Sequence, residues 1–276
     1  MRRFDMSLHG LSIAGPNARA VLAKLCDHDV SNAGFKFMDF REMDVGGAPC
    51  MVNRITYSGD LGYEIWMAPE YERRVYDQIK QAGAEFGIRD FGMRALLSMR
   101  LEKNFPTWFA ELRPIYGPYE AGMDRFVKLS KNDFIGRDAA AQEYENGGKL
   151  RRVTFALEPG NADVMHDEPI WARIGTRAIP QAVETPHGHG ADRFDMAGQT
   201  MPKPAPQSDG EWQVVGWVTS GGYGHSVELS LAQGYIPKEL ATDDGTEFEI
   251  EVLGKRRKAT LWLEPPFDPT GAKMRS

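Results

Sequence analysis

The chain has 276 residues, which is enough for one large domain or for two ordinary domains with a core each. Its formal net charge of −6 argues against a nucleic-acid partner, because proteins that bind a phosphate backbone usually carry a basic surface. No apolar run approaches the roughly 18 residues that cross a bilayer, and the start Met1-Arg2-Arg3 lacks the apolar stretch of a signal peptide.

Two cysteines, Cys26 and Cys50, have neither the spacing of a disulfide framework nor that of a metal site or redox pair. Cys26 lies in an apolar helical pattern and Cys50 begins a strand-like run, so both are expected to be small buried apolar residues. This cysteine usage favours a reducing compartment, and we expect a cytoplasmic protein without a membrane partner.

The N-terminal half alternates predicted helices and strands. Helical spacing predicts a helix over residues 17–26, directly after Pro16, and further helices over 67–86 and 95–101. Strands are predicted over 35–45 and 51–55, joined by a turn at Gly46-Gly47. The βαβ-like alternation up to about residue 141 indicates an α+β or mixed-sheet domain.

Residues 53–65 (NRITYSGDLGYEI) are the most informative segment. A strand enters a Ser-Gly-Asp turn and continues as a second, alternating strand, with Gly59 and Gly62 free to adopt turn conformations. This predicts a tight hairpin that brings Tyr57 and Glu64 close together on neighbouring strands. A phenol and a carboxylate in a partly apolar pocket suit a planar heterocycle with adjacent N–H donors. The alternative is an ordinary hairpin with an exposed glutamate.

After residue 149 the apolar pattern changes to the period of two that is typical of strands. Residues 153–157, 248–252 and 259–263 alternate in this way and predict an antiparallel barrel or sandwich. We place the boundary at Gly147-Gly148, which gives domains at 1–147 and 148–276. Trp108, close to Phe105 and Phe109, is expected in a core.

Residues 175–210 contain ten glycines and prolines and few large apolar side chains, which predicts an exposed surface loop that is dispensable for folding. His187 and His189 in this loop could suggest a metal site. No third ligand is clustered with them, so we expect a solvated loop and no bound metal. The chain also has no Walker loop, no Ser-His-Asp order and no Gly-x-Gly-x-x-Gly before a helix.

The segment 53–65 resembles the tyrosine–glycine–glutamate segment of the folate-binding T-protein superfamily. That superfamily includes the glycine cleavage aminomethyltransferase and the C-terminal folate regions of dimethylglycine and sarcosine dehydrogenases. Further matches occur in the family's order at residues 11–18 (LSIAGPNA), 99–103 (MRLEK), 118–123 (PYEAGM), 133–137 (DFIGR), 216–223 (GWVTSGGY) and 266–269 (PFDP). Residues 102–105 and 108–114 look closer to the dehydrogenase branch than to the free T-protein.

The resemblance implies a fold and a set of contacts. It implies an α+β, mixed-sheet folate domain followed by a C-terminal antiparallel β-barrel, with tetrahydrofolate as the cofactor. Tyr57 and Glu64 would contact its pterin end. Arg100 would either contact folate or form a structural bridge to a nearby carboxylate. Tyr223, near His225, would lie in the C-terminal region that packs over the folate site in the family, although a purely structural loop is the alternative.

In the family, a domain-scale portion of roughly a hundred residues precedes the Gly-Pro motif and carries an aspartate beside the folate nitrogen that accepts the one-carbon unit. Gly15-Pro16 stands near the start of this sequence, so we expect an N-terminally truncated folate domain with weakened folate binding. We also expect little turnover without a second chain. No residue is assigned a catalytic role.

The function implied is tetrahydrofolate-dependent transfer of an aminomethyl or methylene group, linked to dimethylglycine or sarcosine demethylation. The expected partners are folate, a methylated amine donor, and a flavoprotein chain or a second copy of this one. Two alternatives stay open: a non-catalytic folate-binding or assembly subunit that needs a partner chain, and a fragmentary product that binds nothing. Whether the chain alone is an active enzyme stays open too.

Overall fold

The computed structural model describes residues 5–175, 208–242 and 245–276. His187, His189 and nearly all of the predicted loop at 175–210 therefore lie outside the described residues. Two compact units are present: unit 1 comprises Met1–Lys103 and Phe267–Ser276, and unit 2 comprises Asn104–Pro266. Within the described ranges, no helix is long and apolar enough to cross a membrane.

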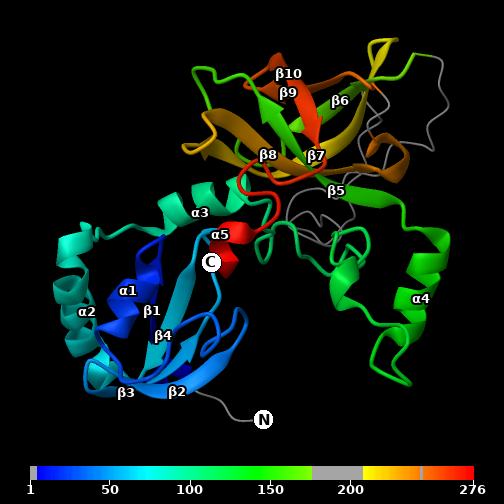
Figure 1. The fold of residues 1–276 in the computed structure, drawn as a ribbon. Helices are drawn as coiled ribbons and strands as arrows, with labels where there is room; N and C mark the ends of the chain where they lie inside the picture. The colour runs from blue at the N-terminus through cyan, green and yellow to red at the C-terminus, as the bar shows by residue number, and fades with distance from the viewer. Residues whose placement is uncertain (1–4, 176–207, 243–244) are drawn as a thin grey trace, which may run out of the picture. The chain divides into compact units, whose positions relative to one another are not determined.

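Unit 1 is an α+β unit built on one sheet (Figure 1). Its strands are β1 (His9–Ala14), β2 (Phe40–Val45), β3 (Ala48–Asn53) and β4 (Gly62–Met67), in the order β1-β4-β3-β2. Its helices are α1 (Ala18–Ala23), α2 (Pro69–Gly83), α3 (Met93–Glu102) and α5 (Ala272–Arg275), with short 3-10 turns at Asp5–Ser7 (η1) and Ala84–Phe86 (η2). In the described part of the chain, every pairing of this sheet is antiparallel.

Local sequence explains several of these boundaries. Gly46 and Gly47 join β2 to β3 with φ of +60° and +73°, the conformation that a two-residue hairpin requires and that glycine adopts readily. Pro69 opens α2 at its first helical position, where its missing N–H costs nothing, and Val75 and Ile79 place one face of the helix in the core. The three predicted helices are all present, and α1 and α2 are shorter than expected.

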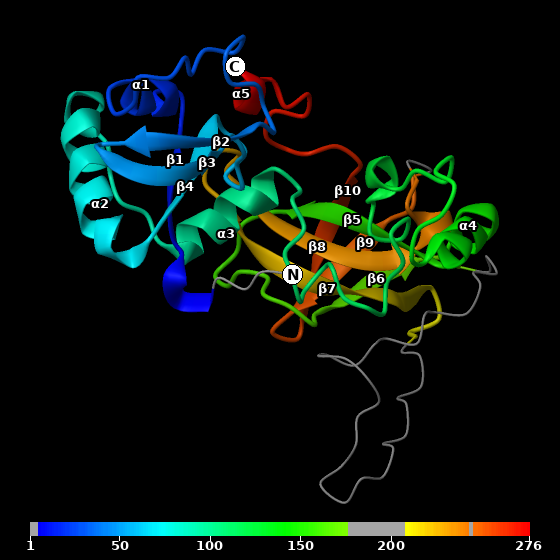
Figure 2. The ribbon, with the colours of Figure 1, turned by 90° about the horizontal axis from the view of Figure 1, so that it is seen from below.

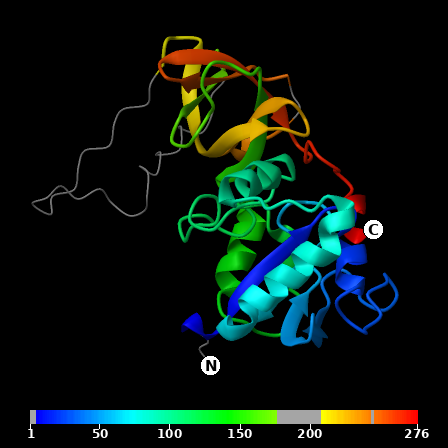
Figure 3. The ribbon, with the colours of Figure 1, turned by 90° about the vertical axis from the view of Figure 1, so that its left-hand side faces the viewer.

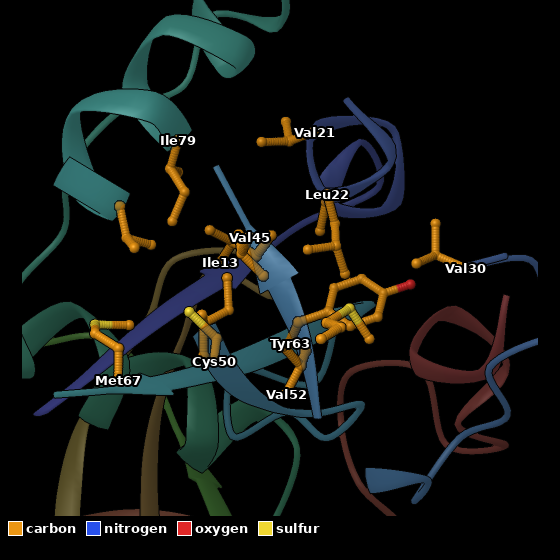
Figure 4. Close-up of a cluster of buried hydrophobic side chains, with 14 of the residues drawn as sticks. Ile13, Val21, Leu22, Val30, Val45, Cys50, Val52, Tyr63, Met67 and Ile79 are labelled. Carbon is orange, nitrogen blue, oxygen red and sulfur yellow. The ribbon is translucent and has the colours of Figure 1, made fainter. Parts of the chain in front are cut away.

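The core of unit 1 lies between one face of the sheet and helices α1 and α2 (Figures 3 and 4). Ile13, Val52 and Tyr63 project from the strands toward Leu22 of α1, and Ile79 of α2 lies on the same side (Figure 4). Cys50 is buried in this cluster, as expected. One face of the sheet therefore packs in the core, and the side chains of the other face lie outside it.

Unit 2 contains a closed antiparallel barrel, as Figure 2 shows. Its strands follow the order β10-β5-β8-β7-β6-β9, with β5 at Leu150–Leu157, β6 at Pro169–Arg173, β7 at Trp212–Gly224, β8 at Leu229–Pro237, β9 at Phe248–Val252 and β10 at Lys255–Trp262. The remaining elements are α4 (Arg137–Asn146) and 3-10 turns at Asp124–Phe126 (η3) and Lys238–Leu240 (η4). The predicted α+β class and C-terminal barrel are confirmed.

The expectation that Trp108 packs in a core is wrong. Trp108 and Phe109 are 69% and 78% exposed. The backbone N–H groups of Glu111 and Leu112 both bond to the Thr107 carbonyl, so the segment closes into a turn whose outer side carries the two rings. The rings pack edge to face on each other, with centroids 5.9 Å apart. An aromatic cluster close in sequence does not by itself predict burial.

Candidate functional site

Glu64 lies on β4 with its side chain on the sheet face opposite the core. The burial pattern of β4 alternates, because Tyr63, Ile65 and Met67 enter the core while Glu64 and Trp66 are only half-buried. Across the neighbouring strands, Glu64 is in register with Ser12 of β1 and Asn53 of β3. A carboxylate is therefore placed among an amide and a hydroxyl on a partly covered surface.

The carboxylate of Glu64 makes no hydrogen bond or ion pair with any residue that the structure describes. A half-buried carboxylate normally has donors around it, because a charged group loses hydration when it is covered. Its oxygens are consequently available as acceptors for the N–H groups of a ligand. A carboxylate can take two parallel N–H donors at once, as it does from a guanidinium.

Tyr57 does not lie on a strand, and the prediction of a tight hairpin is wrong. β3 ends at Asn53 and β4 begins at Gly62, so Tyr57 lies in the connection 54–61. Within this connection the Arg54 N–H bonds to the Asp39 carbonyl, and the hydroxyls of Thr56 and Ser58 lie 3.0 Å apart. The strand pairing therefore stops before Tyr57, and a looped segment carries this half-buried residue.

Arg100 lies in the last turn of α3 and is 3% exposed. Glu102 and Lys103, which follow it, are buried as well. Residues two apart on a helix point in different directions, so both sides of this helix end are covered. Arg100 shares unit 1 with Tyr57 and Glu64, and its two predicted roles, folate contact and structural bridge, both stay open.

Tyr223 lies in unit 2, at the end of the long strand β7. Its ring packs edge to face on His225, with centroids 5.1 Å apart. Gly221 precedes it where a side chain would collide with the Val164 carbonyl, since an added Cβ would lie 2.4 Å from that oxygen. The glycine is therefore explained by close packing within the barrel, and Tyr223 stays a predicted contact.

Two cavities of unit 1 have volumes of about 540 and 760 Å³, and neither is lined by Glu64 or Tyr57. The larger one lies between β1, α2 and the segment that follows α2, and includes Leu11, Ile79 and Phe91. Two neighbours of Glu64 on its sheet face border these cavities: Trp66 lines the smaller one and Ser12 lines the larger one. In the described ranges, no cluster of three or more His, Cys, Asp or Glu side chains suits a metal ion.

The neighbours of Glu64 are candidate functional residues that no sequence motif indicates. Ser12, Asn53 and Trp66 share its sheet face, and the Trp66 indole lies over Gly10, where an added Cβ would come within 2.9 Å of the ring. The signal that could have found them is the period-two alternation of the strands, counted outward from Glu64. The sequence also gives no sign that Lys103 and Asp268, which belong to the motifs at 99–103 and 266–269, form a buried ion pair. The Lys103 Nζ lies 3.0 Å from the Asp268 Oδ2.

The fold and these elements define a class: an α+β domain with a half-buried acidic sheet face, followed by an antiparallel barrel. Comparison with known families agrees with this class. Residues 1–131 match the GCVT N-terminal domain and residues 151–268 match the glycine cleavage T-protein C-terminal barrel domain. The chain therefore belongs to the glycine cleavage T-protein superfamily.

Relatives of two kinds are similar to this chain. Mouse mitochondrial dimethylglycine dehydrogenase is 35% identical over 256 residues, covering 92% of this chain and 25% of the relative. An aminomethyltransferase of Caldanaerobacter subterraneus subsp. tengcongensis is 27% identical, covering 91% of this chain and 56% of the relative. The chain thus spans about a quarter of the dehydrogenase and somewhat over half of the transferase.

Among solved structures, the glycine cleavage system aminomethyltransferase T from Bartonella henselae matches the fold. The match has a TM-score of 0.68 at 22% identity and covers 95% of this chain and 60% of that one. At this identity the likeness supports the fold alone.

Proposed function

We propose that the chain binds tetrahydrofolate on the Glu64 face of unit 1 and takes part in folate-dependent one-carbon transfer of the aminomethyltransferase type. The observation that carries the proposal is the half-buried Glu64 carboxylate, which no described residue engages. Similarity to aminomethyltransferases and to dimethylglycine and sarcosine dehydrogenases supports it. Those relatives also suggest a methylated amine as the one-carbon donor.

The residues on this face fit a pterin ring. The ring is flat and carries adjacent N–H donors, which the two oxygens of one carboxylate can accept side by side. Asn53 and Ser12, in register with Glu64, offer further polar groups, and Trp66 on the same face supplies apolar surface. Tyr57, on the neighbouring connection, has a ring suited to stacking and a hydroxyl suited to hydrogen bonding.

In this proposal the protein binds and orients, while the cofactor supplies the chemistry. When bound, tetrahydrofolate supplies the nitrogen nucleophile that accepts the one-carbon unit. Glu64 would fix the orientation of the ring, and Tyr57 would limit its movement on the sheet face. Holding reacting groups in near-attack geometry can account for a large part of a rate enhancement, so orientation is itself a catalytic contribution. Arg100 and Tyr223 are proposed as further folate contacts.

Calorimetric titration with tetrahydrofolate tests the role of Glu64. Losing a hydrogen-bonded charged partner costs roughly 1.5–3 kcal/mol, so Glu64→Ala should weaken binding about tenfold to a hundredfold. Glu70→Ala, which removes an exposed carboxylate from the first turn of α2, should bind like the parent. Equal affinity of Glu64→Ala and the parent would refute the assignment. Tight binding without formation of methylenetetrahydrofolate from a formaldehyde-releasing amine, whose carbon is already at the oxidation level of the product, would favour a non-catalytic folate-binding subunit.

A further inference from the structure

The connection 54–61 rests on residues that are remote from it in sequence. Its centre is the turn at Ser58 and Gly59, both buried. Gly59 has φ of +90°, and an added Cβ would lie 3.1–3.2 Å from the aliphatic carbons of Lys103. The backbone of the connection therefore lies directly on the Lys103 side chain, which follows α3.

Lys103 is in turn held by the returning C-terminal segment. Its side chain is 2% exposed, and its Nζ lies 3.0 Å from Oδ2 of Asp268, whose side chain is 7% exposed. The same ammonium also donates to the main-chain carbonyl of Asp268. Removing one member of such a covered pair would leave a buried charge without its partner.

Asp268 organises the turn that precedes α5. Its Oδ1 accepts from the Ala272 N–H at 3.0 Å, and its Oδ2 accepts from the Lys273 N–H at 3.1 Å. Burial alone would raise the pKa of Asp268, but these bonds and the Lys103 ammonium together hold the pKa below its usual value. The carboxylate is thus charged at neutral pH and joins α5 to the end of α3.

The C-terminal segment also meets the start of the connection. Arg54 is 1% exposed, and its guanidinium donates to the carbonyls of Phe35 at 2.5 Å, Ser276 at 2.9 Å and Arg275 at 3.2 Å. Residues 267–276 therefore contact the connection at its first residue directly and at Gly59 through Lys103. Tyr57 lies between these two fixed points.

We infer that Lys103 and Asp268 are positioning residues that set folate affinity by fixing the connection that carries Tyr57. The inference rests on the proposed folate site. Neither residue needs to touch the ligand, because the effect passes through the packing of Gly59 on the Lys103 stem. Loss of the pair would leave the sheet and Glu64 in place while the Tyr57 connection gains freedom, so part of the binding energy would be spent on ordering it.

A double-mutant cycle tests the inference. Substitutions that act through a neighbouring element typically change coupling enough to alter affinity about twofold to thirtyfold. Lys103→Met, which keeps an unbranched apolar stem, and Asp268→Asn should each raise the Kd for tetrahydrofolate within that range. In a Tyr57→Ala background the same substitutions should have little further effect, because the residue they position is already gone. All titrations are made well below the Tm of each variant.

The controls separate a positioning role from a general loss of stability. Asp77→Asn, which breaks the exposed Arg73–Asp77 pair on α2, should leave the Kd unchanged. The inference would be overturned if Lys103→Met raised the Kd by the same factor in the Tyr57→Ala background as in the parent. It would also be overturned if both single variants kept the parental Kd. If the parent binds tetrahydrofolate and Glu64→Ala weakens that binding, either result refutes the positioning role and leaves the proposed folate site standing. If the parent itself does not bind, the proposed function fails and the inference fails with it.

Discussion

Glu64 and Tyr57, the two residues assigned to the pterin end of folate, lie on different kinds of element: a strand and a loop. The alternation around Glu64 predicted a strand with the carboxylate on one face, and β4 has that geometry because Tyr63 and Ile65 satisfy the core on the other. Tyr57 was placed on the wrong kind of element. β3 ends at Asn53 because the backbone N–H of Arg54 bonds to the Asp39 carbonyl, which lies outside the paired strands. No local sequence pattern indicates this bond.

Cys50 offers a prediction at this scale. Burial raises the pKa of its thiol to about 11, so at pH 8 roughly one thiol in a thousand is a thiolate, the form that reacts. In Cys26→Ala, Ellman's reagent at pH 8 should therefore label Cys50 very slowly in the native state and stoichiometrically after unfolding. The rate should increase as pH rises toward 11.

Cys50→Ala is the matched control, since it reports Cys26 alone, which is partly exposed. Native labelling of Cys50 at the rate of a free peptide thiol would contradict its burial between the sheet and the helices.

At the scale of elements, a buried carboxylate joins the segment after Asn104 to the barrel. Glu111 is fully buried, and its side chain accepts from Thr219 Oγ1 at 2.7 Å, Ser220 Oγ at 2.5 Å and the Thr107 N–H at 2.8 Å. Thr219 and Ser220 stand where the register of β7 shifts against β8. The two hydroxyls of the motif at 216–223 therefore serve to bind the Glu111 carboxylate. No local sequence pattern predicts this contact.

Glu111→Ala should therefore destabilise unit 2 strongly. Each buried polar group left without a partner costs roughly 1–3 kcal/mol. Ser220 Oγ and the Thr107 N–H lose their acceptor, while Thr219 Oγ1 keeps the Gln233 carbonyl at 3.1 Å, so the free energy of unfolding in urea should fall by about 2 kcal/mol or more. Glu158→Ala, at an exposed position just after β5, should change it by less than about 0.5 kcal/mol. A loss for Glu111→Ala as small as that of Glu158→Ala would show that the Ser220 hydroxyl and the Thr107 N–H find other partners.

For the whole molecule, the fold class could be predicted because the period of the apolar residues changes along the chain. The helical period gives way to alternation near residue 149, and a closed antiparallel barrel follows. The return of residues 267–276 to unit 1 could not be predicted in this way. It depends on the ion pair between Lys103 and Asp268, which are 165 residues apart, and on the bond from the Arg54 guanidinium to the Ser276 carbonyl, 222 residues away.

The central claim is that reduced folate binds on the Glu64 face of unit 1. Hydrogen–deuterium exchange with and without saturating tetrahydrofolate tests it most directly, because bound ligand slows exchange where it covers or orders the backbone. We expect slower exchange in peptides that span residues 54–67. No change at saturation, or protection confined to the cavity that includes Leu11, Ile79 and Phe91, would contradict the claim.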